Sequence, residues 1–358
     1  MTLVAWSGPR ETASRSFPLP SREPLPARAE TLLADSSAHP IASAAMAHDH
    51  KFRFGVQGSL GGDVSSWQAH ARKIESLGYS TLFMPDHFDD TVLAPMTGLA
   101  MAAEATDTLR VGPLVLGNDY KHPAIVAKEA ATIDVLSGGR FELGIGAGWM
   151  KVDYDELGLA YDKPSVRIER LDEAIQVIKG CWGKGPFSFS GAHYTVTDYD
   201  ATPEPAQQPR IPLLVGGGGQ KLLTLAGREA DIVGINPNLR AGTVTADAAK
   251  DTVGDMTDKK IQWIRDGAGD RFDDIELQIR YFLCAVVDDR DSFAEAVAPG
   301  FGVEPDEALR SGVALVGTVD QMCDELVERR EKWGVSYVIV GDDIFEAFAP
   351  VVERLAGT

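Results

Sequence analysis

Two patterns of apolar residues alternate along the chain, and they are clearest in residues 109–149. Residues 109–116 form a short apolar run that ends in turn-favouring residues, as a buried strand does. Residues 124–136 place large apolar side chains among alanines and charged residues, which is the pattern of an amphipathic helix. Residues 141–145 are again apolar apart from Glu142. The segment therefore predicts a βαβ unit whose parallel strands are covered by helices.

The same alternation extends over the chain from Phe52 onward. Apolar runs of strand length predict eight strands, at 52–57, 81–84, 109–116, 141–145, 211–215, 231–235, 276–287 and 335–340. Amphipathic segments predict helices at 63–77, 96–105, 124–136, 165–178, 221–228, 244–265, 319–332 and 344–355. Eight alternations over about 300 residues favour an α/β fold of the (β/α)₈ TIM-barrel type over an open sheet.

Two segments interrupt the alternation, at 149–164 and 183–210. The residues that follow the glycine-rich end of the fourth strand are not expected to open a helix, which a Rossmann fingerprint would require. The second segment predicts a hairpin and an extended excursion over the mouth of the barrel, where insertions shape a site. It holds a proline-rich run and, among its aromatic residues, Phe187, Phe189 and Tyr194.

The first 50 residues differ from the rest because they contain scattered prolines and no periodic apolar pattern. We expect an N-terminal extension at 1–50 with little structure of its own, followed by a single barrel domain at 51–358. A continuous apolar core after a basic start is absent, so no signal peptide is expected. Met46 lies just before the first strand and is an alternative start of the protein.

Composition narrows the classes of partner. The chain has 358 residues, 44% of them hydrophobic, and a formal net charge of −19. This charge disfavours nucleic acid and anionic membranes, and no apolar run is long enough to span a bilayer. Three distant cysteines, Cys181, Cys284 and Cys323, predict neither a disulfide framework nor a structural zinc site, and they fit a reducing cytoplasm.

The strand ends at the mouth of a barrel are where catalytic groups are expected, and the second strand ends in Asp86 and His87. His87 can give or take a proton near neutral pH, so it is a candidate acid or a hydrogen-bond partner of a cofactor. A metal site with Asp89 and Asp90 and a polar loop that caps a helix are the alternatives. No further histidine has ligand spacing, so no metal is expected.

Glycines end two other strands. Gly144, Gly146 and Gly148 either admit a flat ring or a phosphate close to the backbone or simply make a tight corner. Residues 216–219 are four glycines between a predicted strand and a predicted helix, so free backbone N–H groups and the positive helix end converge as a phosphate cradle. A tight turn is the alternative there, and the spacing is not that of a P-loop.

Together these motifs resemble the bacterial luciferase-like monooxygenase family, and within it the oxidoreductases that use the deazaflavin coenzyme F420. The similarity runs in order from 52 to 341. It rests on FRFG (52–55), FMPDHF (83–88), NDYKHP (118–123), LSGGRFELGIGAGW (136–149) and GGGG (216–219) followed by LLTLAG (222–227).

The resemblance implies a flavin or deazaflavin at the mouth of the barrel. It implies a non-proline cis peptide behind the ring, which by position is Leu114–Val115, and His87 facing the reactive edge of the ring as the catalytic residue. The phosphate would lie on Gly217 to Gly219, with Asn236 nearby. The full set of implied cofactor-binding residues is Asp86, His87, Leu114, Val115, Gly117, Asn118, Ala147, Gly148, Trp149, Gly216, Gly217, Gly218, Gly219 and Asn236.

One residue departs from part of the family. Sugar-phosphate dehydrogenases of this kind carry a glutamate acid where this chain has Trp149, whose indole only donates a hydrogen bond or stacks. Oxidation of a sugar phosphate is therefore not expected. Aromatic walls from Trp149, Phe187, Phe189 and Tyr194 would instead favour a small, largely uncharged organic substrate.

The resemblance thus implies an F420-dependent oxidoreductase that transfers a hydride between the deazaflavin and a C=C, C=N or C=O carbon, with His87 supplying or orienting the proton. One alternative is a two-component monooxygenase in which reduced FMN reacts with O₂. A second alternative is a non-catalytic flavin-binding barrel. The family also implies a homodimer and a separate enzyme that reduces the cofactor.

Overall fold

The computed structural model describes residues 50–58, 62–88 and 93–358. Three predictions concern residues outside these ranges: the N-terminal extension apart from His50, the alternative start at Met46, and the candidate metal ligands Asp89 and Asp90.

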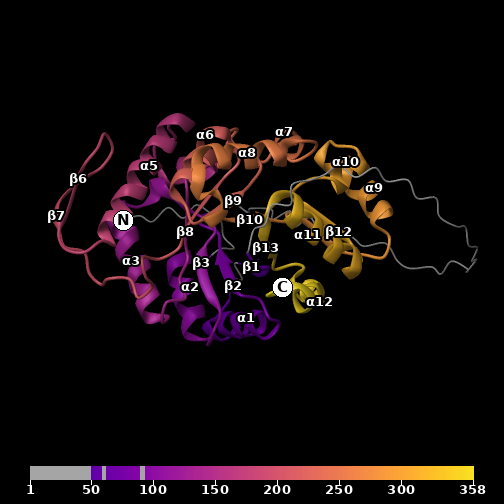
Figure 1. Cartoon of the computed structure of the whole chain (residues 1–358), viewed down its shortest axis with the longest axis horizontal. Helices are drawn as coiled ribbons and strands as arrows, with labels where there is room; N and C mark the ends of the chain where they lie inside the picture. Colours follow the sequence, from indigo (N-terminus) through magenta and orange to yellow (C-terminus); the bar gives the residue numbers. More distant parts are fainter. Residues whose placement is uncertain (1–49, 59–61, 89–92) are drawn as a thin grey trace, which may run out of the picture. The chain divides into compact units, whose positions relative to one another are not determined.

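The strands of the main sheet are all parallel and close into a barrel (Figure 1). They are β1 (Arg53–Gln57), β2 (Thr81–Met84), β3 (Arg110–Pro113), β4 (Leu116–Gly117), β5 (Leu143–Gly146), β8 (Leu213–Gly217), β9 (Ile232–Ile235), β10 (Glu276–Arg280) and β13 (Val335–Gly341). Their order is β3-β2-β1-β13-β10-β9-β8-β5-β4. β3 and β4 are two parts of one strand, and the barrel closes because β4 pairs with β5 and Val111 bridges Phe141.

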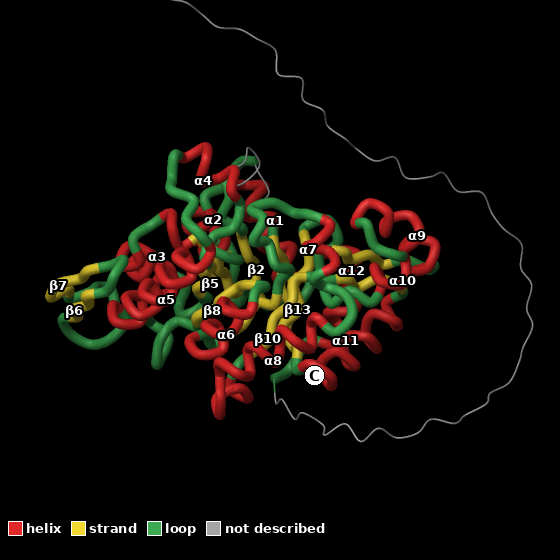
Figure 2. Tube along the Cα trace, turned by 90° about the horizontal axis from the view of Figure 1, so that it is seen from above, coloured by secondary structure: helices red, strands yellow, loops and turns green. Residues whose placement is uncertain are grey.

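Helices follow the strands and surround the barrel (Figure 2). They are α1 (Val64–Ser76), α2 (Pro95–Glu104), α3 (Pro123–Leu136), α5 (Pro164–Cys181), α6 (Gln220–Glu229), α8 (Met256–Ala268), α11 (Val319–Trp333) and α12 (Phe345–Leu355). Local sequence sets their ends: Asp63 caps α1 by accepting from the Ser66 N–H at 2.8 Å, and Pro123 begins α3. The predicted (β/α)₈ barrel is confirmed.

A buried ionic network fills the barrel at the amino ends of its strands. Glu142 is 1% exposed, and its Oε1 accepts from Arg53 Nη1 at 2.5 Å and from Arg110 Nε at 2.6 Å. Glu276 holds the other side of Arg53, whose guanidinium also stacks 3.7 Å from the centre of the Tyr337 ring. Burial opposes ionisation of Glu142, but the two arginines lower its pKa. The network stabilises the end of the barrel opposite its mouth.

Several elements between the barrel units were not predicted. The expected strand at 276–287 is two strands, because β11 (Leu283–Val286) leaves the barrel and pairs with β12 (Ala314–Gly317) in a separate sheet. The single helix expected at 244–265 is α7 (Ala246–Lys250) and α8, separated at Gly254, whose φ is +66°. Helices α9 (Arg290–Phe301) and α10 (Pro305–Leu309) follow β11. An apolar run alone does not reveal which sheet its second half joins.

A short helix, α4 (Lys151–Leu157), begins directly after the glycine-rich strand end, so the prediction that no helix opens there was wrong. Gly158, with φ of +67°, ends it in the left-handed conformation. The helix has only 7 residues, which is too short for a visible apolar period. It nevertheless carries Asp153 to the candidate site.

The predicted hairpin is confirmed as β6 (Phe187–Ser190) paired antiparallel with β7 (Thr195–Tyr199), but its predicted position over the mouth was wrong. It lies beside α3 and α5, at the end of the domain opposite α9 and α10 (Figure 1). Phe187 packs against Gly180 at the end of α5, where a side chain would collide with its ring. The hairpin is thus fixed to the outer helices rather than folded over the strand ends.

Candidate functional site

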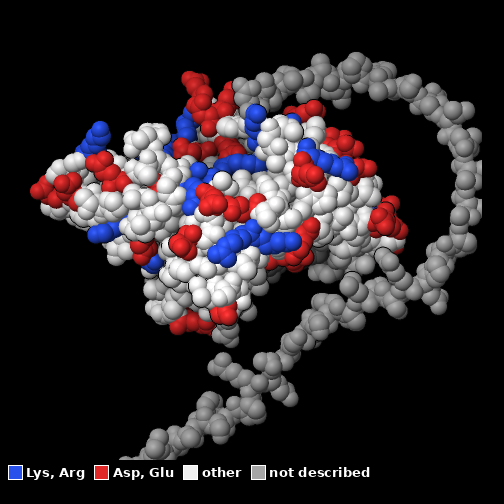
Figure 3. Space-filling model, turned by 90° about the horizontal axis from the view of Figure 1, so that it is seen from below, with Lys and Arg blue, Asp and Glu red and all other residues white. Residues whose placement is uncertain are grey.

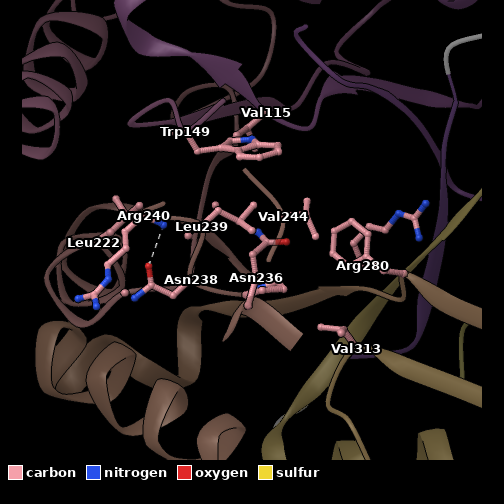
Figure 4. Close-up of a pocket in the computed structure, with 18 of the residues that line it drawn as sticks. Val115, Trp149, Leu222, Asn236, Asn238, Leu239, Arg240, Val244, Arg280 and Val313 are labelled. Carbon is pink, nitrogen blue, oxygen red and sulfur yellow. Dashed lines mark hydrogen bonds between the residues drawn. The ribbon is translucent and has the colours of Figure 1, made fainter. Parts of the chain in front are cut away.

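A large cavity opens at the carboxyl ends of the barrel strands (Figure 4). Its volume is about 1050 Å³, which is near the upper end of the range for small-molecule sites. The sequence-predicted residues that line it are Asp86, His87, Leu114, Val115, Gly117, Ala147, Gly148, Trp149, Gly216, Gly217, Gly218, Gly219 and Asn236. Residues from five different strand ends therefore meet at one place, as in other TIM barrels.

Four predicted residues are not part of the cavity lining. Asn118 is buried, and its side-chain amide donates to the Tyr194 hydroxyl at 3.2 Å. Phe187 and Phe189 lie on the hairpin with Tyr194, so the predicted aromatic wall was wrong for all three. Of the expected aromatic residues, only Trp149 lines the cavity.

His87 is held by a carboxylate that sequence analysis missed. Its Nδ1 lies 2.8 Å from Oδ2 of Asp153, which is only 3% exposed. The Tyr120 hydroxyl donates to the same oxygen at 3.2 Å. Because a carboxylate only accepts hydrogen bonds, the histidine hydrogen sits on Nδ1 and Nε2 is left for other partners. Trp149 meets the imidazole edge to face, with ring centres 5.5 Å apart.

Asp86, the neighbour of His87, has a different role. Its Oδ2 accepts from the Gly117 N–H at 3.0 Å, so it ties the end of β2 to the end of β4. Burial raises the pKa of Asp86, while this hydrogen bond partly offsets the rise. The side chain of Asp86 therefore shapes the loop beside His87.

The peptide bond between Leu114 and Val115 is cis, as the resemblance implied. Gln57 donates from Nε2 to the Leu114 carbonyl at 2.8 Å, and Arg280 donates from Nε to Gln57 Oε1 at 3.1 Å. Val115 lines the cavity from this position. Side chains from β1 and β10 thus fix the backbone at the break between β3 and β4.

The glycines at the end of β5 are explained by packing. A β-carbon on Gly144 would collide with the Pro113 carbonyl, and one on Gly146 would lie 2.9 Å from a methyl group of Val115. Gly148 has φ of +72°, and a β-carbon there would strike the Tyr154 hydroxyl. Close packing therefore requires glycine at all three positions, and Gly146 and Gly148 also line the cavity.

Gly216 and Gly217 end β8, Gly218 and Gly219 join it to α6, and all four glycines line the cavity. A β-carbon on Gly218 would lie 2.5 Å from the Asn236 carbonyl, so this loop must approach the loop after β9 closely. Gly219 is the N-cap residue of α6 and makes no side-chain capping hydrogen bond. N–H groups at a helix start favour an anion, as the sequence predicted.

Arg167 is a second anion-binding candidate and was not predicted. It is 3% exposed and lines the cavity, but its Nε and Nη1 have no hydrogen-bond partner in the described part of the chain. Its guanidinium lies 4.1 Å from the centre of the Tyr161 ring. The ion pair between Lys221 and Glu169, at 3.0 Å, joins the start of α6 to α5, which carries Arg167. A buried arginine with free donors is costly unless an anion completes the site.

A buried lysine, Lys260, fixes the loop after β9. Lys260 Nζ donates to the Asn236 carbonyl at 2.8 Å and pairs with Asp251 Oδ2 at 2.5 Å. Burial lowers the pKa of Lys260, although Asp251 opposes this. The side chain of Asn236 is thereby left to face the cavity (Figure 4).

Residues 50–58, 62–88 and 93–358 contain no candidate metal site, because no group of three or more of their histidines, cysteines, aspartates and glutamates could hold a metal ion. No helix in these ranges is long and apolar enough to cross a membrane. All three cysteines are free. On the face drawn in Figure 3, basic side chains form separate small groups with acidic ones beside them.

Known proteins resemble the chain along most of its length. The model of the luciferase-like monooxygenase family matches residues 46–299. The FMNH₂-dependent dimethylsulfone monooxygenase of Pseudomonas putida is 34% identical over 134 residues, which are 37% of each chain. The pyrimidine monooxygenase RutA of Klebsiella pneumoniae is 40% identical over 91 residues, which are 25% of each. The chain therefore spans well under half the length of these curated relatives.

Solved structures share the fold. The coenzyme F420-dependent tetrahydromethanopterin reductase of Methanopyrus kandleri is 22% identical, with a TM-score of 0.65 over 86% of this chain and 99% of that one. An F420-dependent secondary alcohol dehydrogenase in complex with an F420–acetone adduct is 19% identical, with a TM-score of 0.65 over 84% and 99%. With the matching barrel and family model, the chain belongs to the luciferase-like monooxygenase family.

Proposed function

We propose that this protein is a coenzyme F420-dependent oxidoreductase that transfers a hydride between the deazaflavin and an electrophilic carbon of a small, largely uncharged organic molecule. The observation that carries the proposal is that His87, which is hydrogen-bonded to Asp153, lines the same cavity as the glycine cradle. His87 would transfer the proton, and the glycine cradle would bind a cofactor that carries a phosphate.

The residues present fit such a cofactor. Its phosphate would be bound by the backbone of Gly217, Gly218 and Gly219 at the start of α6, with Arg167 providing the donors that now lack partners. Its ring system would lie beside Val115 and Trp149, which line the same cavity. Every group in this arrangement is uncharged or positive, which suits a phosphate and a flat apolar ring.

The chemistry of the protein itself is proton transfer and orientation. When bound, the deazaflavin supplies or accepts the hydride. Asp153 keeps the His87 hydrogen on Nδ1, so that Nε2 can exchange a proton with the substrate atom next to the reacting carbon. Nε2 has no hydrogen-bond partner among the described residues, and Trp149 limits the positions that the imidazole ring can take.

A second candidate is a two-component monooxygenase that uses reduced FMN and O₂. It is favoured by the curated relatives, because an FMNH₂-dependent enzyme is 34% identical over 134 residues. The glycine cradle and Arg167 serve an FMN phosphate equally well. In either case a separate enzyme would reduce the cofactor.

Binding titrations separate the two candidates. The full-length protein, freed of cofactor, is titrated with F420 and separately with FMN by fluorescence quenching or calorimetry. Tighter binding of F420 supports hydride transfer without oxygen, whereas tighter binding of FMN supports the monooxygenase. Failure of both to bind contradicts the assignment of a flavin-type cofactor.

A further inference from the structure

The cavity is lined by further residues besides the candidate cofactor-binding ones. In Figure 4, Leu222 and Arg240 lie at one end, while Val244 and Val313 lie at the other. We call this second end the distal lobe, which is lined chiefly by Val244, Ala249, Val253, Phe282 and Val313. The phosphate cradle, His87 and Trp149 are outside this set, although they line the same cavity.

We propose that the distal lobe binds the non-reacting hydrocarbon part of the substrate, an alkyl chain or an aromatic group, and so selects uncharged carbonyl-type compounds with an extended apolar tail. The proposal rests on the proposed function in that the reacting end of the substrate is taken to lie near His87. All five defining residues of the lobe are apolar. Burial of apolar surface is the main source of affinity for such a tail.

The polar side chains at the distal lobe are already used within the protein. Thr252 Oγ1 donates to the Ala249 carbonyl at 2.6 Å and lies 2.7 Å from the hydroxyl of Ser311. Ser311 in turn accepts from the N–H of Val313 at 3.3 Å. These hydroxyls therefore have little capacity left for a polar substrate group, and the wall that they belong to presents apolar atoms.

Arg280 is the cation beside the lobe, and it too is engaged. Its Nε donates to Gln57, and its Nη1 donates to the Tyr281 carbonyl. The Phe282 ring stacks over its guanidinium, whose carbon is 4.7 Å from the ring centre. Arg280 is further balanced by the negative charge of Asp343. It is therefore a structural cation, and an anionic tail would gain little from it.

The rim of the lobe exposes apolar surface. Val244 is 70% exposed and Phe282 is 55% exposed, and both line the cavity. The Gly312 N–H donates to the Thr252 carbonyl at 2.8 Å, so the segment that follows α7 is bound to the segment that precedes β12. Large apolar side chains at the rim of a concave site are typical of an entrance for apolar ligands.

The test uses 2-alkanones from 2-butanone to 2-decanone as probes, and binding to the full-length protein is measured by calorimetry with and without F420. The dissociation constant should fall about fourfold for each added methylene group until the lobe is full. The same series of straight-chain carboxylates should bind more weakly at every length.

Replacement A249F puts a ring into the lobe and should remove the gain from long chains while leaving 2-butanone binding unchanged. The matched control is A296F, because Ala296 is exposed on α9 and does not line the cavity. V313F repeats the test from the opposite wall, and thermal unfolding verifies that each variant is folded.

Three results would overturn the proposal: no dependence on chain length, carboxylates that bind more tightly than ketones, or the same chain-length series in A249F and V313F as in the parent protein. The cofactor titration is scored separately. If neither F420 nor FMN binds but the ketone series behaves as expected, the proposed function fails and the distal lobe stands. If the cofactor binds and the ketone series is flat, only the lobe fails.

Discussion

Replacement of Asp153 by asparagine removes one charge next to His87 and keeps the size of the side chain. The structure gives the magnitude of the expected effect. The bond from His87 Nδ1 to Asp153 is 2.8 Å long, and its acceptor is 4% exposed, so solvent screens it little. A hydrogen bond to a charged group contributes about 1.5–3 kcal/mol, against about 0.5–1.5 kcal/mol for a neutral one. The loss of about 1–2 kcal/mol corresponds to a decrease in turnover of roughly 5- to 30-fold.

The assay is oxidation of reduced F420 by a 2-alkanone under anaerobic conditions, followed by the absorbance of the deazaflavin. Asp153 does not line the cavity, so the affinity for F420 should stay within about twofold of the parent protein. D155N is the matched control, since Asp155 lies on the same helix but pairs only with exposed Lys151, and an exposed pair contributes little.

Two results would refute this reasoning. If D153N turns over as fast as D155N with intact cofactor binding, Asp153 does not position His87. If turnover and F420 affinity fall together by the same factor, the carboxylate supports the fold of the cavity and has no separate effect on the histidine.

Three further predictions concern the cradle and the barrel. R167M should weaken FMN or F420 binding by about 10- to 100-fold, because charge-assisted bonds to phosphate are lost. Riboflavin has no phosphate, so calorimetry should show that it binds equally to R167M and to the parent protein. G218A should weaken the same cofactors because its β-carbon would lie 2.5 Å from a backbone carbonyl, whereas G300A, with open space around it, should bind normally. E142Q should lower the free energy of unfolding in urea by about 3–5 kcal/mol at pH 7, as for other broken buried pairs. Because the folded-state pKa of Glu142 lies below 4.5, this difference should be present above pH 4.5 and shrink as the pH falls through the folded-state pKa; a difference that grows in acid would contradict the ionic role.

Sequence patterns predicted the regular part of the molecule well because each barrel unit carries its own local signals. Pro123 at the start of α3 and the glycines that follow its end mark that helix without any tertiary information. Strands buried on both faces read as continuous apolar runs, which is why eight of them were found. The irregular elements between the barrel strands, such as α4 and β11, have weaker local sequence patterns.

The sequence predicted those site residues that stand at strand ends and missed those whose partners are distant in the chain. His87 and the glycines were found because they stand at strand ends, which a barrel always brings together. Asp153 was missed because its partner is 66 positions away and its helix has 7 residues. Arg167 did leave a signal, since it stands four positions before Leu171 on the buried side of α5, where a charge needs an explanation. The position of Phe187 was predicted wrongly because the sequence of a hairpin does not indicate which part of the fold the hairpin packs against.

The central claim is hydride transfer from a deazaflavin without oxygen, and one measurement tests it most directly. Reduced F420 is mixed anaerobically with the protein and a panel of ketones, enones and imines, and its oxidation is followed in the parent protein and in H87A. We predict acceptor-dependent oxidation in the absence of O₂ that is largely lost in H87A while F420 still binds. Oxidation of the substrate only with FMNH₂ and O₂, or equal rates in H87A, would contradict the account.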